Sequence, residues 1–512
     1  MKKLSIYQVL VTTACLAMLT GCTDLVNEEK DSIVRTSEGG GFTPGNPTEL
    51  LASAYKDLGT YTDQAGIYAL GVHTSAEMIP PTRGVDWGDN GVWRTLDSHT
   101  WDASHSYIRD AWNNLNQRVY KANEIIASNP SPEQKAQALF LRAFNMFHVM
   151  DYWGVAPIRE VTQGPDDLPK VFTRSEAFDF IVKDLEEALP NLAKIGPGPN
   201  NGVASKAAAN FLLAKLYLNK AVYKSNMGEV SYTFDQADMD KVIAYVDAIE
   251  KDGYSLESAY FKNFTANASN EIILVSLEGT PQNRWMMTMH YDQDPSGWNG
   301  FTTLADFYDT FEDKDVRKGL PPTEDGTKYS WLGKGFLFGQ QRGPVKDSKG
   351  EYVTDATGKI KIEDIIDSRS KKPLKFTRDV PLAGAATDKG IRVIKYHPAD
   401  AGKYILMRFG EAYLMKAEAM FRGGKAAEAL VMINALRTKN KATALASLTA
   451  DNLFEEIGRE LYWEGGKRTI EIRFGKFVNG QGATVNAPHT VLYPIPSTAI
   501  VSNPNLEQNP GY

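Results

Sequence analysis

The clearest pattern of apolar and polar positions lies in residues 404–439, which read YILMRFGEAYLMKAEAMFRGGKAAEALVMINALRTK. Apolar residues recur there every three or four positions on both sides of a Gly423-Gly424 pair, and this spacing places them on one face of a helix. The two stripes are Leu406, Gly410, Tyr413, Ala417 and Met420, then Ala426, Ala429, Leu430, Ile433 and Leu436. The segment therefore predicts two antiparallel helices. This arrangement is typical of a tetratricopeptide repeat, although an ordinary helical hairpin has the same pattern.

Three more helix pairs are predicted upstream. They comprise residues 46–58 with 108–126, residues 133–153 with a helix opened by a capping box at Thr173, and residues 204–223 with 238–250. One hairpin cannot bury its own apolar face, whereas stacked hairpins form a continuous core. The predicted fold class is therefore mainly α, a tetratricopeptide-repeat-like superhelix of about four helix pairs.

Two segments interrupt the helical pattern. Residues 59–103 have little periodicity, and residues 261–400 are rich in glycine, proline and aromatic residues, with a strand at 272–277 and a hairpin-like stretch at 345–375. The predicted organisation is a helical scaffold (46–260) with a ligand-side loop (59–103), a loop-rich insertion with minor β (261–400), a last repeat pair with a following helix (401–475) and an irregular segment (476–512).

The N-terminus carries a processing signal. Lys2 and Lys3 precede an apolar run that ends in Leu19-Thr20-Gly21-Cys22, the pattern of a bacterial lipobox. We expect a signal peptide over residues 1–21, lipidation at Cys22, and a flexible acidic tether over 22–45. An ordinary secretory signal with Cys22 as a chance thiol is the alternative.

Composition and motifs exclude several functions. The net charge of −7 offers no basic surface for a phosphate backbone, so nucleic acid is not an expected partner. Nucleotide-binding glycine motifs, a nucleophile elbow and metal-ligand histidine spacings are missing from the sequence. Residues 292–297 begin like a calcium loop, but Thr303 stands where the bidentate glutamate belongs, which favours an Asp-rich turn. We therefore expect no cofactor and no metal.

Tryptophans are the most informative candidates for chemistry. Trp112, Trp153 and Trp463 are predicted in helices as core residues, whereas six others lie in the two loop-rich segments. Aromatic rings stack on the C–H faces of sugars while nearby polar groups bind the hydroxyls, so these loops suit a carbohydrate. For any single tryptophan, packing of its own loop is an equal explanation. The candidate ligand residues are Arg83, Asp86, Trp87, Asn90, Trp93, Trp285, Tyr291, Trp298 and Trp331.

Several segments together resemble the SusD/RagB family of Bacteroidetes outer-membrane lipoproteins. The most specific match is the ending LYPIPSTAIVSNPNLEQNPGY. Further matches are AQALFLRAFNMFHVMDYWGVAPI, YILMRFGEAYLMKAEAMFRGG, PTRGVDWGDNGVWRTLDSHTW and RELYWEGGKRTIEIRFGKF. One departure is Ile470, followed by Glu471, where the family usually has aspartate.

The resemblance implies a cell-surface lipoprotein of the outer membrane that captures oligosaccharides or polysaccharides and delivers them to a SusC-like TonB-dependent transporter. It implies a binding protein, not an enzyme, with ligand contacts from loops on the face away from the repeat hairpins. Trp87 is the residue best matched to a family contact, although Trp93 could be the contact and Trp87 the packing residue. A peptide-capturing member of the family, a surface glycosidase and a scaffold lipoprotein remain alternatives.

Overall fold

The computed structural model describes residues 42–164, 167–478 and 487–512. The predicted signal peptide, Cys22 and most of the tether lie outside these ranges. Residues 44–512 form one compact unit, in which the helical scaffold and the loop-rich insertion share a hydrophobic core. Among the residues described, no helix is both long and apolar enough to cross a membrane.

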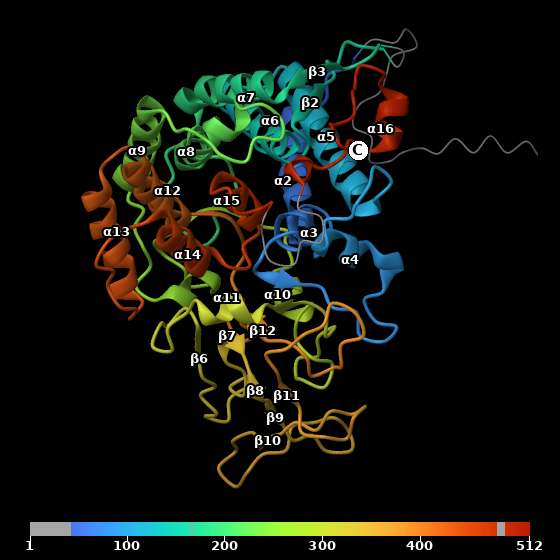
Figure 1. The fold of residues 1–512 in the computed structure, drawn as a ribbon, viewed down its shortest axis with the longest axis vertical. Helices are drawn as coiled ribbons and strands as arrows, with labels where there is room; N and C mark the ends of the chain where they lie inside the picture. The colour runs from blue at the N-terminus through green and yellow to red at the C-terminus, as the bar shows by residue number, and fades with distance from the viewer. Residues whose placement is uncertain (1–41, 165–166, 479–486) are drawn as a thin grey trace, which may run out of the picture. The chain divides into compact units, whose positions relative to one another are not determined.

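The predicted superhelix is confirmed. The scaffold helices from α5 to α9 pack side by side in sequence order, with α2 against α5. Across the insertion α9 is followed in space by α12, and both α13 and α14 pack against α12 (Figure 1). The scaffold helices are α2 (Pro47–Asp57), α5 (Ser106–Ala127), α6 (Pro132–Trp153), α7 (Arg174–Ala188), α8 (Lys206–Tyr223), α9 (Gln236–Lys251), α12 (Phe409–Arg422), α13 (Ala426–Lys439) and α14 (Ala450–Leu461).

Helix starts follow the predicted chemistry. The Asn46 side chain accepts a hydrogen bond from the Thr48 N–H ahead of Pro47, and Thr173 and Glu176 form the reciprocal capping box that opens α7.

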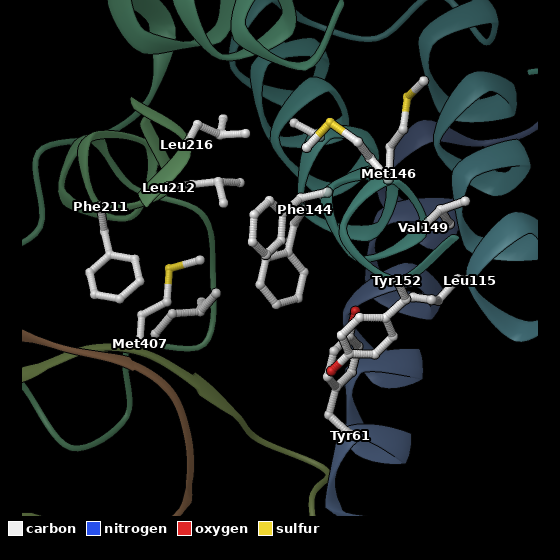
Figure 2. Close-up of a cluster of buried hydrophobic side chains, with 14 of the residues drawn as sticks. Tyr61, Leu115, Phe144, Met146, Val149, Tyr152, Phe211, Leu212, Leu216 and Met407 are labelled. Carbon is white, nitrogen blue, oxygen red and sulfur yellow. The ribbon is translucent and has the colours of Figure 1, made fainter. Parts of the chain in front are cut away.

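The core of the scaffold lies between the helices. Figure 2 shows apolar side chains of α6 (Phe144, Met146, Val149 and Tyr152) on one side and of α8 (Leu212 and Leu216) on the other.

The start of the 404–439 segment was predicted wrongly. Tyr404–Arg408 is a strand, β13, paired antiparallel with β4 (Ile272–Ser276), and the helix α12 begins only at Phe409. A run of four apolar residues fits either a buried strand or a helix turn, and here the unpaired edge of β4 decides between them. The predicted strand at 272–277 is thereby confirmed.

The insertion is built from short strands and turns. Figure 1 shows β6 to β11 gathered at the end of this unit away from α7. Its other elements after β4 are α10 (Asn283–Met286), β5 (Thr302–Thr303), α11 (Ala305–Asp309), β6 (Gly319–Leu320), β7 (Lys334–Leu337), β8 (Gly339–Gln340), β9 (Arg342–Pro344), β10 (Ile362–Asp364), β11 (Lys375–Phe376) and β12 (Arg392–Ile394). The β9–β10 pair and the bridges beyond it form the expected hairpin.

The segment 59–103 is more regular than predicted. It contains the short helices α3 (Ile67–Val72) and α4 (Val92–Asp97) and the strand β1 (Met78–Ile79), which pairs with β5. Short strands β2 (Val155–Ile158) and β3 (Lys170–Thr173) pair between α6 and α7, and α15 (Lys467–Arg473) follows α14. Trp463 is buried as expected, but it lies beyond the end of α14, which corrects its predicted place in a helix.

A buried group of charges fastens β13 to its surroundings. The Arg408 guanidinium lies 2.9 Å from Glu271, 3.0 Å from Glu460 and 2.7 Å from Glu464, and only 1% of its side chain is exposed. Arg317 of the insertion reaches Glu460 at 3.2 Å. Breaking a buried ion pair leaves an uncompensated charge, so this group couples the insertion to α14 and β13.

In the described part of the C-terminal segment, residues 487–512 are irregular apart from a short 3-10 helix (Pro488–Val491) and α16 (Ser497–Ser502), but they are firmly bound. The Tyr493 hydroxyl donates to the Leu70 carbonyl at 2.6 Å, and Trp101 Nε1 donates to the Tyr512 hydroxyl at 2.7 Å. Asn509 donates to the carbonyl of Trp153. The end of the chain therefore fixes the loop 59–103 against the scaffold.

Candidate functional site

Two tryptophans from distant loops form a platform. The ring centroids of Trp87 and Trp298 lie 6.5 Å apart, and Trp87 Nε1 donates to the Trp298 carbonyl at 2.9 Å. The exposed fraction of Trp298 is 39%, and Trp87 is half-buried. Large aromatic side chains left open to solvent mark interaction surfaces, so we call this pair the tryptophan platform.

The loop that carries Trp87 is strained. Trp87, Asp89 and Asn90 adopt positive φ angles of 60°, 36° and 54°, which non-glycine residues rarely do. Each such residue costs on the order of 1–3 kcal/mol and persists where the surroundings impose it, commonly at binding sites. The strain places the Trp87 ring against its neighbours and leaves Asn90 exposed beside it.

Buried aromatic residues support the platform from below. Phe301 lies 4.7 Å from Trp87 and 5.0 Å from Trp93, measured between ring centroids. Trp93 is buried, and its Nε1 donates to Asp89 at 2.6 Å. Trp93 therefore packs beneath Trp87, and of the two it is Trp87 that solvent reaches.

A glycine makes room for the Trp87 ring. A Cβ atom at Gly300 would lie 2.4 Å from ring atoms of Trp87 and 2.8 Å from the Met287 carbonyl oxygen. Replacing Gly300 with alanine is therefore expected to displace Trp87 and weaken ligand binding by about tenfold, with a loss of stability of about 1–3 kcal/mol. Binding measurements and urea unfolding test this together. A variant that binds ligand like the parent would contradict it. Gly466→Ala, where a Cβ meets nothing within 4 Å and φ is −100°, is the control for adding a methyl group at another glycine of negative φ.

Polar groups flank the platform on one side. Arg369, in the hairpin turn after β10, donates to Asp86 at 3.0 Å, and its guanidinium carbon lies 4.5 Å from the centroid of the Tyr291 ring. Asp292 accepts the Ser368 N–H at 2.7 Å, which ties the same turn to the loop that carries Tyr291. Three loops thus converge, and they bring the candidates Asp86, Trp87, Tyr291 and Trp298 together.

Three candidates are placed in packing roles, and we do not carry them into the site. Arg83 is buried and donates to the carbonyls of Ala386 and Lys389, so its guanidinium is committed to the backbone. Trp331 is buried and donates to the Asp294 carbonyl at 2.6 Å. Trp93 is the third, for the reason given above. Trp285 is half-buried and packs with the hydrophobic cluster around Trp331, apart from the platform.

A buried histidine in the platform's floor gives the fold a dependence on pH. The ring centroid of His73 lies 4.1 Å from that of Phe301, and neither ring nitrogen has a hydrogen-bond partner among the described groups. Burial lowers the pKa of His73 to about 3, with a further contribution from the Arg284 charge.

The direction of this pH dependence follows from comparing His73 in the folded and the unfolded protein. Above about pH 6.5 His73 is neutral whether folded or unfolded, whereas below it only the unfolded chain takes up the proton, so stability falls by about 1.4 kcal/mol per pH unit towards pH 3. In His73→Phe this proton uptake is lost. The slope of the free energy of unfolding against pH should therefore decrease, between about pH 6.5 and 4.5, by the contribution of about one proton. Urea unfolding across this range measures the difference between variant and parent. An unchanged slope would show that His73 is protonated in the folded state.

A possible metal-ligand set lies next to the platform. Ligand atoms of His290, Asp292 and Asp367 come within 4.8 Å of one another. However, the Asp292 N–H donates to Nδ1 of His290 at 3.1 Å, and Asp367 already accepts the N–H groups of Arg369 and Ser370. These backbone hydrogen bonds occupy Nδ1 of His290 and one oxygen of Asp367, whereas Nε2 of His290 has no partner among the described groups, and we propose no metal here.

Sequence comparisons place this architecture among known proteins. A profile of the SusD family matches residues 375–512, and one described as "Starch-binding associating with outer membrane" matches residues 69–218. The starch-binding protein SusD of Bacteroides thetaiotaomicron is 25% identical to this chain, and the alignment covers 98% of each protein. This chain belongs to the SusD family. The matched descriptions are of starch-binding proteins, and one of them names an association with the outer membrane.

Solved structures agree with this assignment at the level of the SusD fold. A laminarin-binding SusD-like protein matches with a TM-score of 0.65 and 19% identity, over 91% of this chain and 99% of that one. Surface glycan-binding protein A from Bacteroides fluxus matches with a TM-score of 0.63 and 19% identity, over 93% of this chain and all of that one.

A second sequence relative is the SusD-like protein P38 of Formosa agariphila. It is 21% identical, over 80% of this chain and 81% of its own length.

Sequence reasoning missed two residues of the SusD-family chain that shape the platform. Arg369 lies in a lysine-rich hairpin about 280 positions from Asp86, and no periodicity links them. Gly300 is one of 42 glycines, and only its contact with Trp87 distinguishes it. The Trp298-Asn299-Gly300-Phe301 stretch was the available indication, because a glycine between two aromatic residues is consistent with close packing of a ring on the backbone.

Proposed function

We propose that this SusD-family protein captures glycans at the tryptophan platform and delivers them to a SusC-like TonB-dependent transporter in the outer membrane. The observation that carries the proposal is the pairing of Trp87 with the exposed Trp298, because two adjacent aromatic faces suit consecutive sugar rings. Asp86, Asn90, Tyr291 and Arg369 supply donors and acceptors for hydroxyl groups around the rings.

The first experiment separates glycans from other ligands. Residues 44–512, which form one compact unit, are titrated calorimetrically with starch, laminarin, dextran and mannan and with a mixture of tryptic peptides. The proposal expects saturable binding of at least one polysaccharide. Binding of peptides alone would favour a peptide-capturing member of the family. Release of reducing ends from any polysaccharide would favour a glycosidase.

Membrane attachment through Cys22 is part of the proposal. It is supported by the lipobox pattern at residues 19–22 and by a family associated with the outer membrane. In the full chain, Cys22→Ser should move the protein from the outer-membrane fraction to the soluble fraction, because each buried acyl CH₂ contributes about 0.8 kcal/mol to membrane binding. Retention of the variant in the membrane fraction would contradict anchoring at this residue. Co-purification of a TonB-dependent transporter with the anchored protein tests the partner.

A further inference from the structure

The exposed ring of the tryptophan platform is held through its backbone. The Trp298 carbonyl accepts a hydrogen bond from the Trp87 indole N–H at 2.9 Å, and the Trp298 N–H donates to the Met286 carbonyl at 2.6 Å. The Trp298 ring meets that of Trp87 at an interplanar angle of 48° and is otherwise open to solvent on one side. Because the allowed rotamers of a side chain depend on φ and ψ, the residues beside Trp298 decide where its ring points.

Asn299, the next residue, points the opposite way. It is 2% exposed and adopts a positive φ of 51°, a conformation that asparagine tolerates better than most residues. Its Oδ1 accepts a hydrogen bond from Nη2 of Arg392 at 2.8 Å, and its Nδ2 donates to the Thr387 carbonyl at 3.0 Å. An amide side chain can make both bonds at once, so Asn299 ties the loop to the layer below.

Arg392 is a rigid support for this contact. It lies fully buried in β12 and also donates to the carbonyls of Thr387, Lys389 and Gly390 in the segment before it. Its guanidinium carbon lies 4.6 Å from the centroid of the Phe376 ring. Turning the guanidinium away would leave several hydrogen-bonding groups unpaired, which is costly, so the position of Arg392 is fixed.

Thr387 links the same layer to the other side of the platform. Its hydroxyl donates to Asp367, whose carboxylate accepts a hydrogen bond from the Arg369 N–H at 2.7 Å. The Arg369 side chain binds Asp86 at 3.0 Å, next to the first tryptophan of the platform. The second tryptophan and the turn that carries Arg369 are therefore fixed to the same short segment of chain.

From these contacts we propose that Asn299 is a positioning residue of the glycan site: through Arg392 and Thr387 it sets the direction of the Trp298 ring. The inference rests on the proposed function and deepens it. Asn299 is too deeply buried to contact a ligand, so its effect on binding passes through Trp298. A ring already held in its binding position loses less conformational freedom when the ligand binds, which favours affinity.

Asn299→Gly removes the contact without straining the backbone, because glycine readily adopts a positive φ. The Thr387 carbonyl keeps its hydrogen bond from Nη2 of Arg392 at 2.9 Å, so both of the former partners of Asn299 stay paired. We expect the affinity for the polysaccharide that the parent binds to fall by about fivefold in calorimetry. Circular dichroism and thermal unfolding verify that the variant is folded.

Two further variants separate the contact from loop flexibility. Asn129→Gly makes the same substitution at a φ of 52° in an exposed position after α5, and it should leave binding unchanged. Asn299→Asp tolerates the same φ and keeps an acceptor for Arg392, so it should bind about threefold more tightly than Asn299→Gly. Equal losses in Asn299→Asp and Asn299→Gly would overturn the role assigned to the Arg392 contact.

A double-mutant cycle tests whether Asn299 acts through Trp298. In a chain that already carries Trp298→Ala, adding Asn299→Gly should change the affinity by less than about twofold, because the ring that it positions is gone. A loss in this background as large as in the parent would show that Asn299 acts elsewhere and would overturn the proposal.

Fluorine NMR follows the ring without any ligand. In protein whose nine tryptophans are labelled as fluorotryptophan, the Trp298 resonance is the one that Trp298→Ala lacks. It should shift or broaden in Asn299→Gly, whereas the resonances of Trp112 and Trp153, which are buried in α5 and α6, should not. An unchanged Trp298 resonance would overturn the positioning role. Absence of polysaccharide binding by the parent would overturn the proposed function, while the NMR comparison would still decide how Trp298 is held.

Discussion

Replacing Trp87 with alanine should weaken glycan binding by about 30-fold, which corresponds to about 2 kcal/mol. The indole supplies one face of the platform, and its N–H holds the Trp298 carbonyl, so its removal also releases the second ring. Truncation of a tryptophan at the centre of a binding surface commonly has an effect of this size. Calorimetric titration with the polysaccharide that the parent binds measures it.

Two comparison variants make this prediction specific. Trp298→Ala should also weaken binding, but by less than Trp87→Ala, because it removes one ring and leaves the other in place. Tyr308→Ala removes a half-buried aromatic ring that packs with Phe336 and Phe338 on another part of the insertion, and it should leave binding unchanged. If Trp87→Ala folds and binds like the parent, the platform is not the glycan site.

Replacing Arg408 with methionine should lower the free energy of unfolding by about 3–5 kcal/mol. Methionine occupies a similar volume but leaves the buried Glu271 without its cation and the buried Glu460 with Arg317 alone. Urea unfolding followed by tryptophan fluorescence measures the loss. The matched control is Lys135→Met, because Lys135 pairs with Glu187 at the surface and such exposed pairs contribute about 0–1 kcal/mol. A loss below about 1 kcal/mol for Arg408→Met would mean that neighbouring carboxylates take up protons or rearrange.

The helical scaffold was predictable because each helix is specified by residues within it or next to it. Caps at Asn46 and Thr173, and apolar residues at helical spacing in 108–126 and 133–153, identify each helix from its own residues. The strand at Tyr404–Arg408 was not predictable in this way, because its conformation depends on β4 more than 120 residues earlier. Whether a short apolar run forms a strand or a helix depends on the segments it packs against.

The candidate site was predictable by residue type and not by role. Tryptophan counts drew attention to the loops that carry Trp87 and Trp298, and these two residues do lie together. The same reasoning gave equal weight to Trp93 and Trp331, which are buried, because burial is decided by contacts such as Phe301 beneath Trp93 that sequence spacing does not encode. Arg83 illustrates the same limit, since an arginine in a polar loop reads as exposed until its backbone acceptors are known.

The hydrogen bond between Trp101 and Tyr512 bears on the order of events during biosynthesis. The two residues are 411 positions apart, and the loop 59–103, which includes α3, makes further contacts with residues near the C-terminus. The ligand-side loop therefore cannot reach its final packing until residue 512 has been made. A contact of such long range forms more slowly than contacts between sequence neighbours, so we expect the loop 59–103 to be among the last parts of the molecule to pack.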